Sequence, residues 1–435
     1  MEGTCSANSG CSHRQDKLHA FAPSIPVIPL HLSHTDIFGG AAIAAYRLHS
    51  GLRRAGVDSH MLVLRKRSSD PAVEEMSGPL VPQMQVRDWG INRLPARVYR
   101  HRDRAAVWSV NWFPYTRQFS HLKADLVHLH WIGTNFLPIS AWPHLKQPVV
   151  WTLHDSWAFT GGCHIPYDCR RYEEHCGRCP ILKSQREHDL SWWTWRSKSR
   201  ALAKMRPVIV SPSTWLAGCA RSSSLLGSAE IHTIPHGLDL EVFRPSAPEA
   251  ARAALSLPPD RPLVAFGAMA ALTDWNKGAD LLIEALNRLD SDADCLIFGS
   301  DSAPDGLSRK AYAAGTLSDE QRIAQVYAAA DVMVVPSRSE NLPLTVMESL
   351  ACGTPVVAFR IGGIPDLIEH RVNGYLAEPF DTADLARGIA WVLEDPERHA
   401  RLCAAARAKA EREYEIVHIA RRYLALYEDI LSRPR

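Results

Sequence analysis

Short apolar runs alternate with amphipathic helical stretches along most of this chain, and the alternation occurs in two series. The first series opens with an apolar run at 26–34, a loop containing two glycines, and a stretch with apolar residues at helical spacing that stops at Gly56. Further apolar runs of strand length follow at 124–131, 148–155, 208–213 and 231–237. A strand, a glycine loop, a helix and a second strand in this order are typical of a doubly wound α/β fold.

The second series repeats this order after a stretch rich in proline and polar residues. The length of 435 residues suits two domains of about 200 residues each. We predict an N-terminal domain over 23–240, a linker over 241–260, and a second Rossmann-like domain over 261–412. The final helix, 413–435, is expected to pack back on the N-terminal domain, and residues 1–22 are expected to form a disordered tail.

Composition and charge exclude several classes of protein. Apolar residues make up 46% of the chain, charged residues 22%, and the formal net charge is +2. The near balance of charge, without a basic run, gives no reason to expect a nucleic-acid partner. No apolar stretch reaches the roughly 18 residues that a membrane-spanning helix needs, and the N-terminus does not resemble a secretory signal. We therefore expect a cytoplasmic protein, with the inner face of the cytoplasmic membrane as an alternative place of action.

Five segments carry a resemblance to a known family. They are the stretches at 36–42, 212–216, 234–245, 276–286 and, most specifically, SENLPLTVMESLACGTPVVAFRIGGIPDLI at 339–368. Together they resemble glycosyltransferase family 4, and the stretch WTLHDSWAFTGGC at 151–163 is similar to colanic acid and exopolysaccharide enzymes.

The resemblance implies a GT-B fold, an α/β architecture in which two Rossmann-like domains face each other across a cleft. The C-terminal domain would bind the nucleotide sugar and the N-terminal domain the acceptor. The implied reaction transfers a sugar from a UDP- or GDP-linked donor to a saccharide or lipid-linked acceptor, with retention of anomeric configuration.

Two glutamates lie just before and within a predicted helix over 342–353. Glu340 lies just before this helix, whose N-terminal amides can hold a diphosphate. Glu348 lies about 12 Å further along the axis, roughly the span from a distal phosphate to a ribose. The resemblance implies that Glu340 contacts the donor sugar and that Glu348 binds the ribose. Three further residues of this segment are expected on the donor side: Asn341, Leu342 and Thr345.

Other candidate site residues lie in loops that follow predicted strands. Lys277 can place an ammonium group on a phosphate, and Arg338 is a candidate second cation because the loop at 267–276 contains no arginine. Gly39 and Gly40 allow the backbone to approach a phosphate closely.

Polar residues at the ends of two predicted strands are expected on the acceptor side of the cleft. His154 matches the histidine that the family places near the reacting sugar, and we include it with Glu340 and Lys277 among the catalytic residues. Asp155 and Asp36 are expected to face the acceptor.

The implied chemistry requires no cofactor or metal. The acidic run Asp290, Asp292 and Asp294 lacks the glycine and the remaining ligands of a calcium loop, so we interpret it as a solvated loop. A predicted insertion at 160–182 offers a second candidate metal site, this time built from thiols. Its four cysteines are Cys163, Cys169, Cys176 and Cys179. Their C-x5-C-x6-C-x2-C spacing favours a structural zinc site, and four free thiols or a redox pair are the alternatives.

The segment at 191–206 combines three tryptophans with basic residues. Such a helix can pack its tryptophans into the domain, or it can contact an anionic membrane surface peripherally. The leading function is glycosyl transfer in polysaccharide or lipopolysaccharide synthesis. A nucleotide-sugar epimerase of the same fold and a catalytically inactive sugar-nucleotide-binding scaffold are the alternatives.

Overall fold

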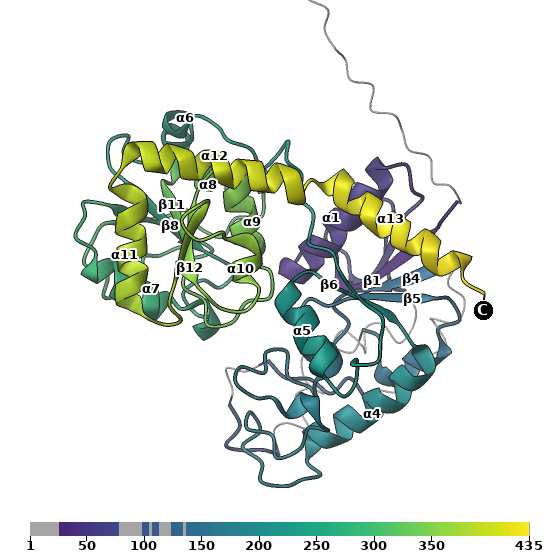
Figure 1. The fold of residues 1–435 in the computed structure, drawn as a ribbon. Helices are drawn as coiled ribbons and strands as arrows, with labels where there is room; N and C mark the ends of the chain where they lie inside the picture. The colour runs from purple at the N-terminus through teal and green to yellow at the C-terminus, as the bar shows by residue number, and fades with distance from the viewer. Residues whose placement is uncertain (1–25, 78–97, 104–106, 113–122, 134–135, 435) are drawn as a thin grey trace, which may run out of the picture.

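The protein folds into two α/β domains, each built on a parallel sheet (Figure 1). The computed structural model describes residues 26–77, 98–103, 107–112, 123–133 and 136–434. The tail expected at 1–22 lies outside these residues.

The N-terminal sheet has the strand order β3-β2-β1-β4-β5-β6-β7 and is parallel throughout. Its strands are β1 Pro29–Thr35, β2 His60–Arg65, β3 Val73–Glu75, β4 Leu126–Leu129, β5 Val149–Thr152, β6 Val208–Ser211 and β7 Ile231–Thr233. Its helices are α1 Gly40–Arg54, α4 Leu190–Met205 and α5 Thr214–Ser222. β4 and β5 are buried along their whole length because helices cover both faces of the sheet.

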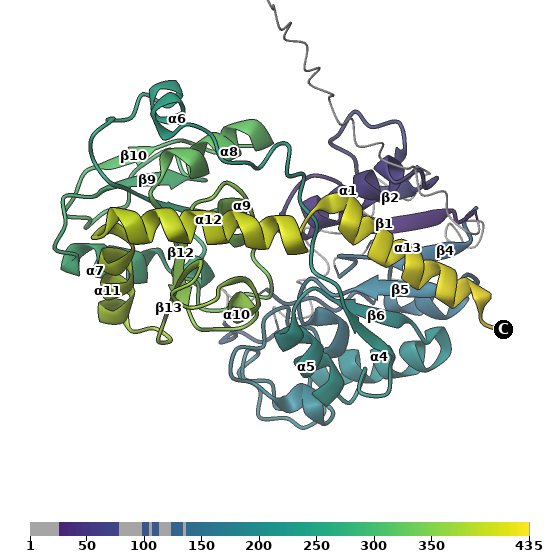
Figure 2. The ribbon, with the colours of Figure 1, turned by 45° about the horizontal axis from the view of Figure 1, so that its top comes forward.

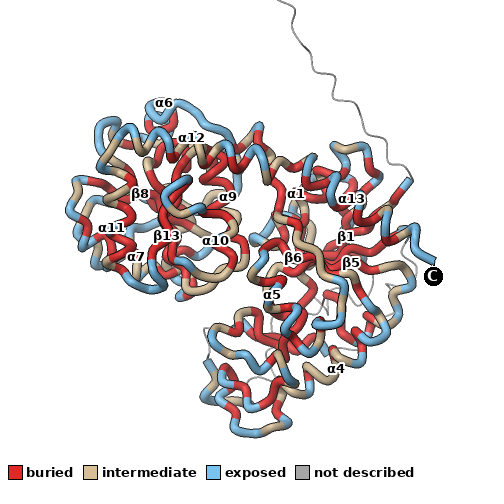
Figure 3. The backbone as a smooth tube through the Cα atoms, viewed as in Figure 1, coloured by how far each residue is buried: buried red, intermediate tan, exposed pale blue. Residues whose placement is uncertain are grey.

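The C-terminal sheet is also parallel and has the order β10-β9-β8-β11-β12-β13. Its strands are β8 Leu263–Gly267, β9 Asp294–Phe298, β10 Ala311–Ala313, β11 Val332–Val335, β12 Val356–Phe359 and β13 Gly374–Ala377. Its helices are α7 Ala279–Arg288, α8 Glu320–Ala329, α9 Leu344–Ala351, α10 Ile364–Leu367, α11 Thr382–Leu393 and α12 Pro396–Glu413. The two sheets confirm the predicted α/β class with two Rossmann-like domains, and the buried strands form the centre of each domain in Figure 3.

The stretch at 241–260, expected to be a linker, is part of the C-terminal domain. Pro248 begins helix α6, Pro248–Ala254, and supplies the fixed φ angle that suits a first helical position. Phe243 and Ala251 are buried in the same apolar cluster as α8 and α9. The proline-rich composition therefore marks a helix start and tight turns, and apolar side chains between the prolines attach the segment to the domain.

The last helix, α13 Ile416–Ser432, leaves α12 and crosses to the N-terminal domain (Figure 2). Its buried face includes Ile419, Tyr423 and Tyr427, which share an apolar cluster with Leu48 and Leu52 of α1. Spacings of four residues place these side chains on one side of α13. The C-terminal end of the chain thus completes the outer layer of the N-terminal sheet.

In both sheets the strand order reverses beside the first strand, between β1 and β4 and between β8 and β11. Open parallel sheets bind ligands beyond the carboxyl ends of their strands at such a switch point. The segments that leave these ends carry His34 to Gly40 and His130 in one domain, and Pro336 to Asn341 in the other. The topology therefore directs the candidate site residues to the boundary between the domains.

Candidate active site

Helix α9 presents its N-terminus at this boundary. It begins at Leu344, two residues later than predicted, because Pro343 takes the N-cap position with extended backbone. The amides of Leu344 and Thr345 donate no hydrogen bond to any residue that the structure describes. Such amides and the helix dipole together form a place for an anionic group.

Lys277 and Glu340 meet beside this helix end. The Lys277 Nζ atom donates a hydrogen bond of 2.8 Å to Oε1 of Glu340. Lys277 lies in a 3-10 turn, Trp275–Lys277, which ends at Gly278 with a left-handed φ of 71°. Burial lowers the pKa of Lys277, but the Glu340 carboxylate outweighs this effect and the net pKa is raised. The ammonium group therefore stays charged at neutral pH.

Arg338 lies on the next strand exit but its guanidinium is already engaged. It donates to both carboxylate oxygens of Asp280, at 3.0 and 2.6 Å, and to the backbone carbonyl of Trp275 at 2.6 Å. It also covers the Trp275 ring at 4.3 Å from the centroid. These contacts fix the turn that carries Lys277, and the predicted phosphate contact of Arg338 stays a prediction.

Glu348 lies inside the domain boundary, where both of its carboxylate oxygens have protein partners. Oε1 accepts a hydrogen bond of 2.7 Å from Arg47 of α1, and Oε2 accepts one of 3.0 Å from the Tyr327 hydroxyl. Arg47 also donates to Glu320 of α8, so one cation from the N-terminal domain joins two carboxylates of the C-terminal domain. The sequence did not predict Arg47 and Tyr327 as partners of Glu348. Each lies on an ordinary amphipathic helix, and nothing in the local pattern shows that it contacts a residue far away in the chain.

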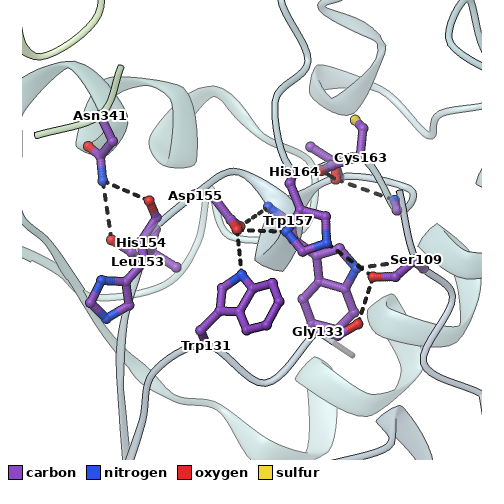
Figure 4. A network of polar contacts seen from close by, with 12 residues as sticks. Ser109, Trp131, Gly133, Leu153, His154, Asp155, Trp157, Cys163, His164 and Asn341 are labelled. Carbon is purple, nitrogen blue, oxygen red and sulfur yellow. Dashed lines mark hydrogen bonds and ion pairs between the residues drawn. The ribbon is translucent and has the colours of Figure 1, made fainter. Parts of the chain in front are cut away.

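Asn341 connects the two strand ends across the boundary (Figure 4). Its side-chain amide donates to the backbone carbonyls of Leu153 and His154, at 3.4 and 3.3 Å. Its oxygen accepts a hydrogen bond of 2.6 Å from Ser213. Asn341 thus brings the segment around Glu340 and the segment of His154 together. Leu342 is buried, and Thr345 is half-buried on the first turn of α9.

Gly39 and Gly40 lie at the start of α1, facing the other domain. Gly39 has a φ of 94°, in the left-handed region that favours glycine. A Cβ atom on Gly39 would lie 3.6 Å from the side chain of Met269, in the loop after β8. The glycine loop of the N-terminal domain therefore closely approaches the C-terminal domain.

His154 is the first member of a line of histidines that runs into the N-terminal domain. Its Nε2 atom lies 3.1 Å from Nδ1 of His130, and Nε2 of His130 lies 2.9 Å from Nδ1 of His31. The ring of His236 stacks on His154 with centroids 5.3 Å apart. Burial lowers the pKa of His154 to about 4, so this imidazole is neutral at physiological pH.

A further buried imidazole, His128, extends this group towards α13, where its nitrogens lie 2.7 Å from the Tyr427 hydroxyl and 2.7 Å from Oγ1 of Thr152. Among the described residues, one group of three metal-ligating side chains has its ligand atoms within 4.8 Å of one another. It consists of His31, His128 and His130. Both nitrogens of His128 and of His130 have hydrogen-bond partners, as does Nδ1 of His31, whereas Nε2 of His31 is buried without one in the part of the chain that the structure describes. The alternating LHLSH and LVHLHW patterns, which place these rings on neighbouring strands, were the signal available in the sequence.

The two aspartates expected on the acceptor side are held by the protein itself. Asp155 accepts hydrogen bonds from the Trp131 indole, His164 and the Trp157 amide, at 2.9, 2.7 and 2.8 Å (Figure 4). Asp36 is buried and accepts from the amides of its own loop and of the segment after β2. Both carboxylates therefore shape loops, and their predicted contact with an acceptor stays a prediction.

Next to Asp155 lies a small pocket. It is lined mainly by aromatic and imidazole groups, among them Trp131, His154, Trp157 and His164. Its free space is about 10 Å³, room for at most one water molecule, so these side chains form a packed wall beside His154.

Two family profiles match the chain. One, described as glycosyltransferase family 4, matches residues 38–242, and the other, described as glycosyl transferases group 1, matches residues 249–409.

Curated relatives include two D-inositol 3-phosphate glycosyltransferases. The one from Xylanimonas cellulosilytica is 36% identical over 200 residues, which cover 42% of this chain and 47% of that protein. The one from Mycolicibacterium smegmatis is 35% identical over 222 residues, covering 48% and 49% of the two chains. The chain thus spans about half the length of these relatives.

Solved structures share the fold over nearly the whole chain. Sucrose-phosphate synthase from Thermosynechococcus elongatus superposes with a TM-score of 0.67 at 20% identity, covering 93% of this chain and 99% of that chain. HepE from Anabaena, solved in complex with UDP-glucose, gives a TM-score of 0.64 at 18% identity with the same coverage. At these identities the likeness concerns the GT-B fold. The two profiles, at 38–242 and 249–409, show that the chain belongs to glycosyltransferase family 4.

Proposed function

We propose that this enzyme transfers a sugar from a nucleoside-diphosphate sugar to a saccharide or lipid-linked acceptor, with retention of anomeric configuration. The observation that carries the proposal is the group at the start of α9. There the unpaired amides of Leu344 and Thr345, the Lys277 ammonium and the Glu340 carboxylate lie at the domain boundary. The amides and the ammonium would hold the diphosphate, and Glu340 would accept hydrogen bonds from the donor sugar.

The reaction follows from this arrangement. The acceptor oxygen attacks the anomeric carbon from the face that the diphosphate leaves, and the acceptor proton passes to a leaving phosphate oxygen. Lys277 and the α9 amides stabilise the negative charge that develops on the diphosphate. Neutral His154 offers a hydrogen bond to a sugar hydroxyl, with its ring held by His130 and His236.

UDP-linked sugars are the first donors to test. The fold neighbour HepE from Anabaena was solved with UDP-glucose and with UDP and glucose. The curated relatives carry the name of D-inositol 3-phosphate glycosyltransferases, so a small polyol phosphate belongs among the acceptors beside saccharides and lipid-linked saccharides. The stretch at 151–163 favours a role in exopolysaccharide assembly.

The test is a transfer assay on the purified protein with a panel of UDP- and GDP-sugars, followed by NMR of the product anomer. We expect turnover of one donor class, an anomer retained from donor to product, and at least a 100-fold loss of kcat in Glu340→Gln. The matched control is Glu284→Gln, on an exposed ion pair with Arg288. Inversion of the anomer, or full activity of Glu340→Gln, would overturn the proposal.

Contact with a membrane surface is supported by one face of α4. Trp193, Arg200 and Lys204 are exposed at helical spacing, and the Trp193 side chain remains half exposed while Trp195 packs against the core. No helix among the described residues is long and apolar enough to cross a membrane. We propose that α4 lies on an anionic lipid surface because its exposed face combines Trp193 with Arg200 and Lys204, and this would bring the cleft to a lipid-linked acceptor.

A further inference from the structure

Four cysteine side chains converge on one pocket in the insertion after β5. Cys163, Cys169, Cys176 and Cys179 all line one small pocket, and all four are free thiols. Cys163, Cys176 and Cys179 are buried, and Cys169 is half-buried. Four soft donor groups from a single loop thus line one pocket.

The backbone around the last two cysteines forms a tight knuckle. Cys176, Gly177 and Arg178 have φ values of 50°, 97° and 43°, all in the left-handed region. A Cβ on Gly177 would lie 2.1 Å from the carbonyl of Glu187, so only glycine fits there. Backbone amides also point at sulfur: those of Ile181 and Leu182 at Cys179, and that of Gly161 at Cys176. These contacts offset only part of the effect of burial, which raises the pKa of both thiols.

A buried cation lies beside the thiols. Lys198 of α4 is fully buried, and its ammonium donates to the carbonyls of Trp157 and Thr160 and covers the Trp157 ring. It is close enough to Cys163 and Cys176 to interact with both electrostatically. In the described part of the chain it forms no ion pair with a carboxylate. Metal-bound thiolates would give this buried amine negatively charged neighbours.

We propose that Cys163, Cys169, Cys176 and Cys179 bind one Zn²⁺ in a closed, tetrahedral structural site. Each thiol loses its proton to solvent and forms one Zn–S bond, which leaves a complex of net charge −2 beside the Lys198 ammonium. In the structure no three of the four sulfur atoms lie within 4.8 Å of one another. Binding at Zn–S distances of about 2.3 Å therefore contracts the pocket around the ion.

The site would fix the wall of the cleft. His164 follows Cys163 directly and holds Asp155 at 2.7 Å, beside the pocket at His154. Tyr167, between Cys163 and Cys169, contacts the Trp275 ring of the other domain with centroids 5.7 Å apart. Trp275 lies two residues before Lys277. This consequence for catalysis rests on the proposed function, whereas binding of the metal does not.

The direct test is elemental analysis of the full chain, purified under reducing conditions without chelators. We expect one zinc per chain, loss of zinc in Cys176→Ser and in Cys179→Ser, and retention in Cys403→Ser, a half-buried cysteine on α12 outside the cluster. Replacement by Co²⁺ should give the intense visible absorption of a tetrahedral thiolate site. Absence of stoichiometric zinc, iron in its place, or full zinc in both knuckle variants would overturn the proposal.

A measurement on the unmodified protein avoids variants that fail to fold. With zinc bound, the four thiols should resist a thiol reagent under native conditions and become reactive when a chelator removes the metal. Reactivity of all four before chelation, or disulfides in the freshly reduced protein, would contradict the assignment. These outcomes do not depend on transfer activity: zinc without any sugar transfer would reject the proposed function alone.

Discussion

Nη2 of Arg47 lies 2.7 Å from Oε1 of Glu348, and this contact joins the first helix of one domain to the donor-side helix of the other. The same nitrogen lies 2.8 Å from Glu320. Both Arg47 and Glu348 are almost completely buried, so the pair is shielded from solvent. Glu348 is also the residue that the family resemblance assigns to the ribose, and that assignment stays a prediction.

Removal of Arg47 should loosen this boundary. In Arg47→Met, Glu348 would remain buried beside Tyr327 without its cation, which costs on the order of 3 kcal/mol when a buried pair loses one partner. We expect a lower free energy of unfolding in denaturant titrations and a raised KM for the donor. Arg53→Met, an exposed arginine on the same helix, is the control. Equal stability of the two variants would show that the pair contributes nothing to the folded state.

Lys277 and Arg338 should act as a unit. Lys277→Met removes a cation from the leaving diphosphate and should lower kcat by about 100-fold. Arg338→Ala should lower it less, because Arg338 holds the turn of Lys277 through the Trp275 carbonyl. In a double-mutant cycle the two effects should therefore not add. Additive losses in the double variant would instead favour an independent contact between Arg338 and the donor.

The buried histidines predict a loss of stability in mild acid. Burial lowers the pKa of His154 to about 4 and places those of His31, His128, His130 and His236 well below their ordinary value. The unfolded chain takes up protons first as the pH falls below about 6.5, so the free energy of unfolding should decrease from there towards pH 4. Each histidine contributes up to about 1.4 kcal/mol per pH unit. Urea titrations at several pH values should show this slope, and it should become shallower in His128→Gln.

Exposed Trp193 predicts binding to anionic lipid. The protein should pellet with vesicles of phosphatidylglycerol and phosphatidylcholine in a cosedimentation assay. Trp193→Ser or added salt should lower the fraction that pellets. Phe380→Ser, an equally exposed aromatic residue on the other domain, should leave it unchanged. A wild-type protein that stays in the supernatant would reject the membrane contact.

The sequence predicted the two parallel sheets and the residues at their strand exits because both depend on local pattern. Buried parallel strands appear as continuous apolar runs, and Gly39 and Gly40 mark the exit of the first strand. These signals were sufficient to place Lys277, Glu340 and His154 in the same region, at the boundary between the domains.

Partners from distant elements could not be predicted in this way. Arg47 meets Glu348 across 301 positions of the chain, and nothing in the local pattern of α1 distinguishes it from a solvated arginine. The segment at 241–260 was assigned incorrectly for a similar reason. Its proline-rich composition is typical of a linker. Phe243 is nevertheless buried, because it packs against helices that lie far away in the sequence.

The crossing of α13 sets an order for biosynthesis. The N-terminal sheet is made first, but the side chains that cover Leu48 and Leu52 arrive with Ile419 and Tyr423, after the whole C-terminal domain. During synthesis, the first domain therefore exposes this apolar surface until the second domain and α13 have been made. Early release, or a stop codon just before residue 416, would leave that surface open to aggregation and His128 without its Tyr427 partner.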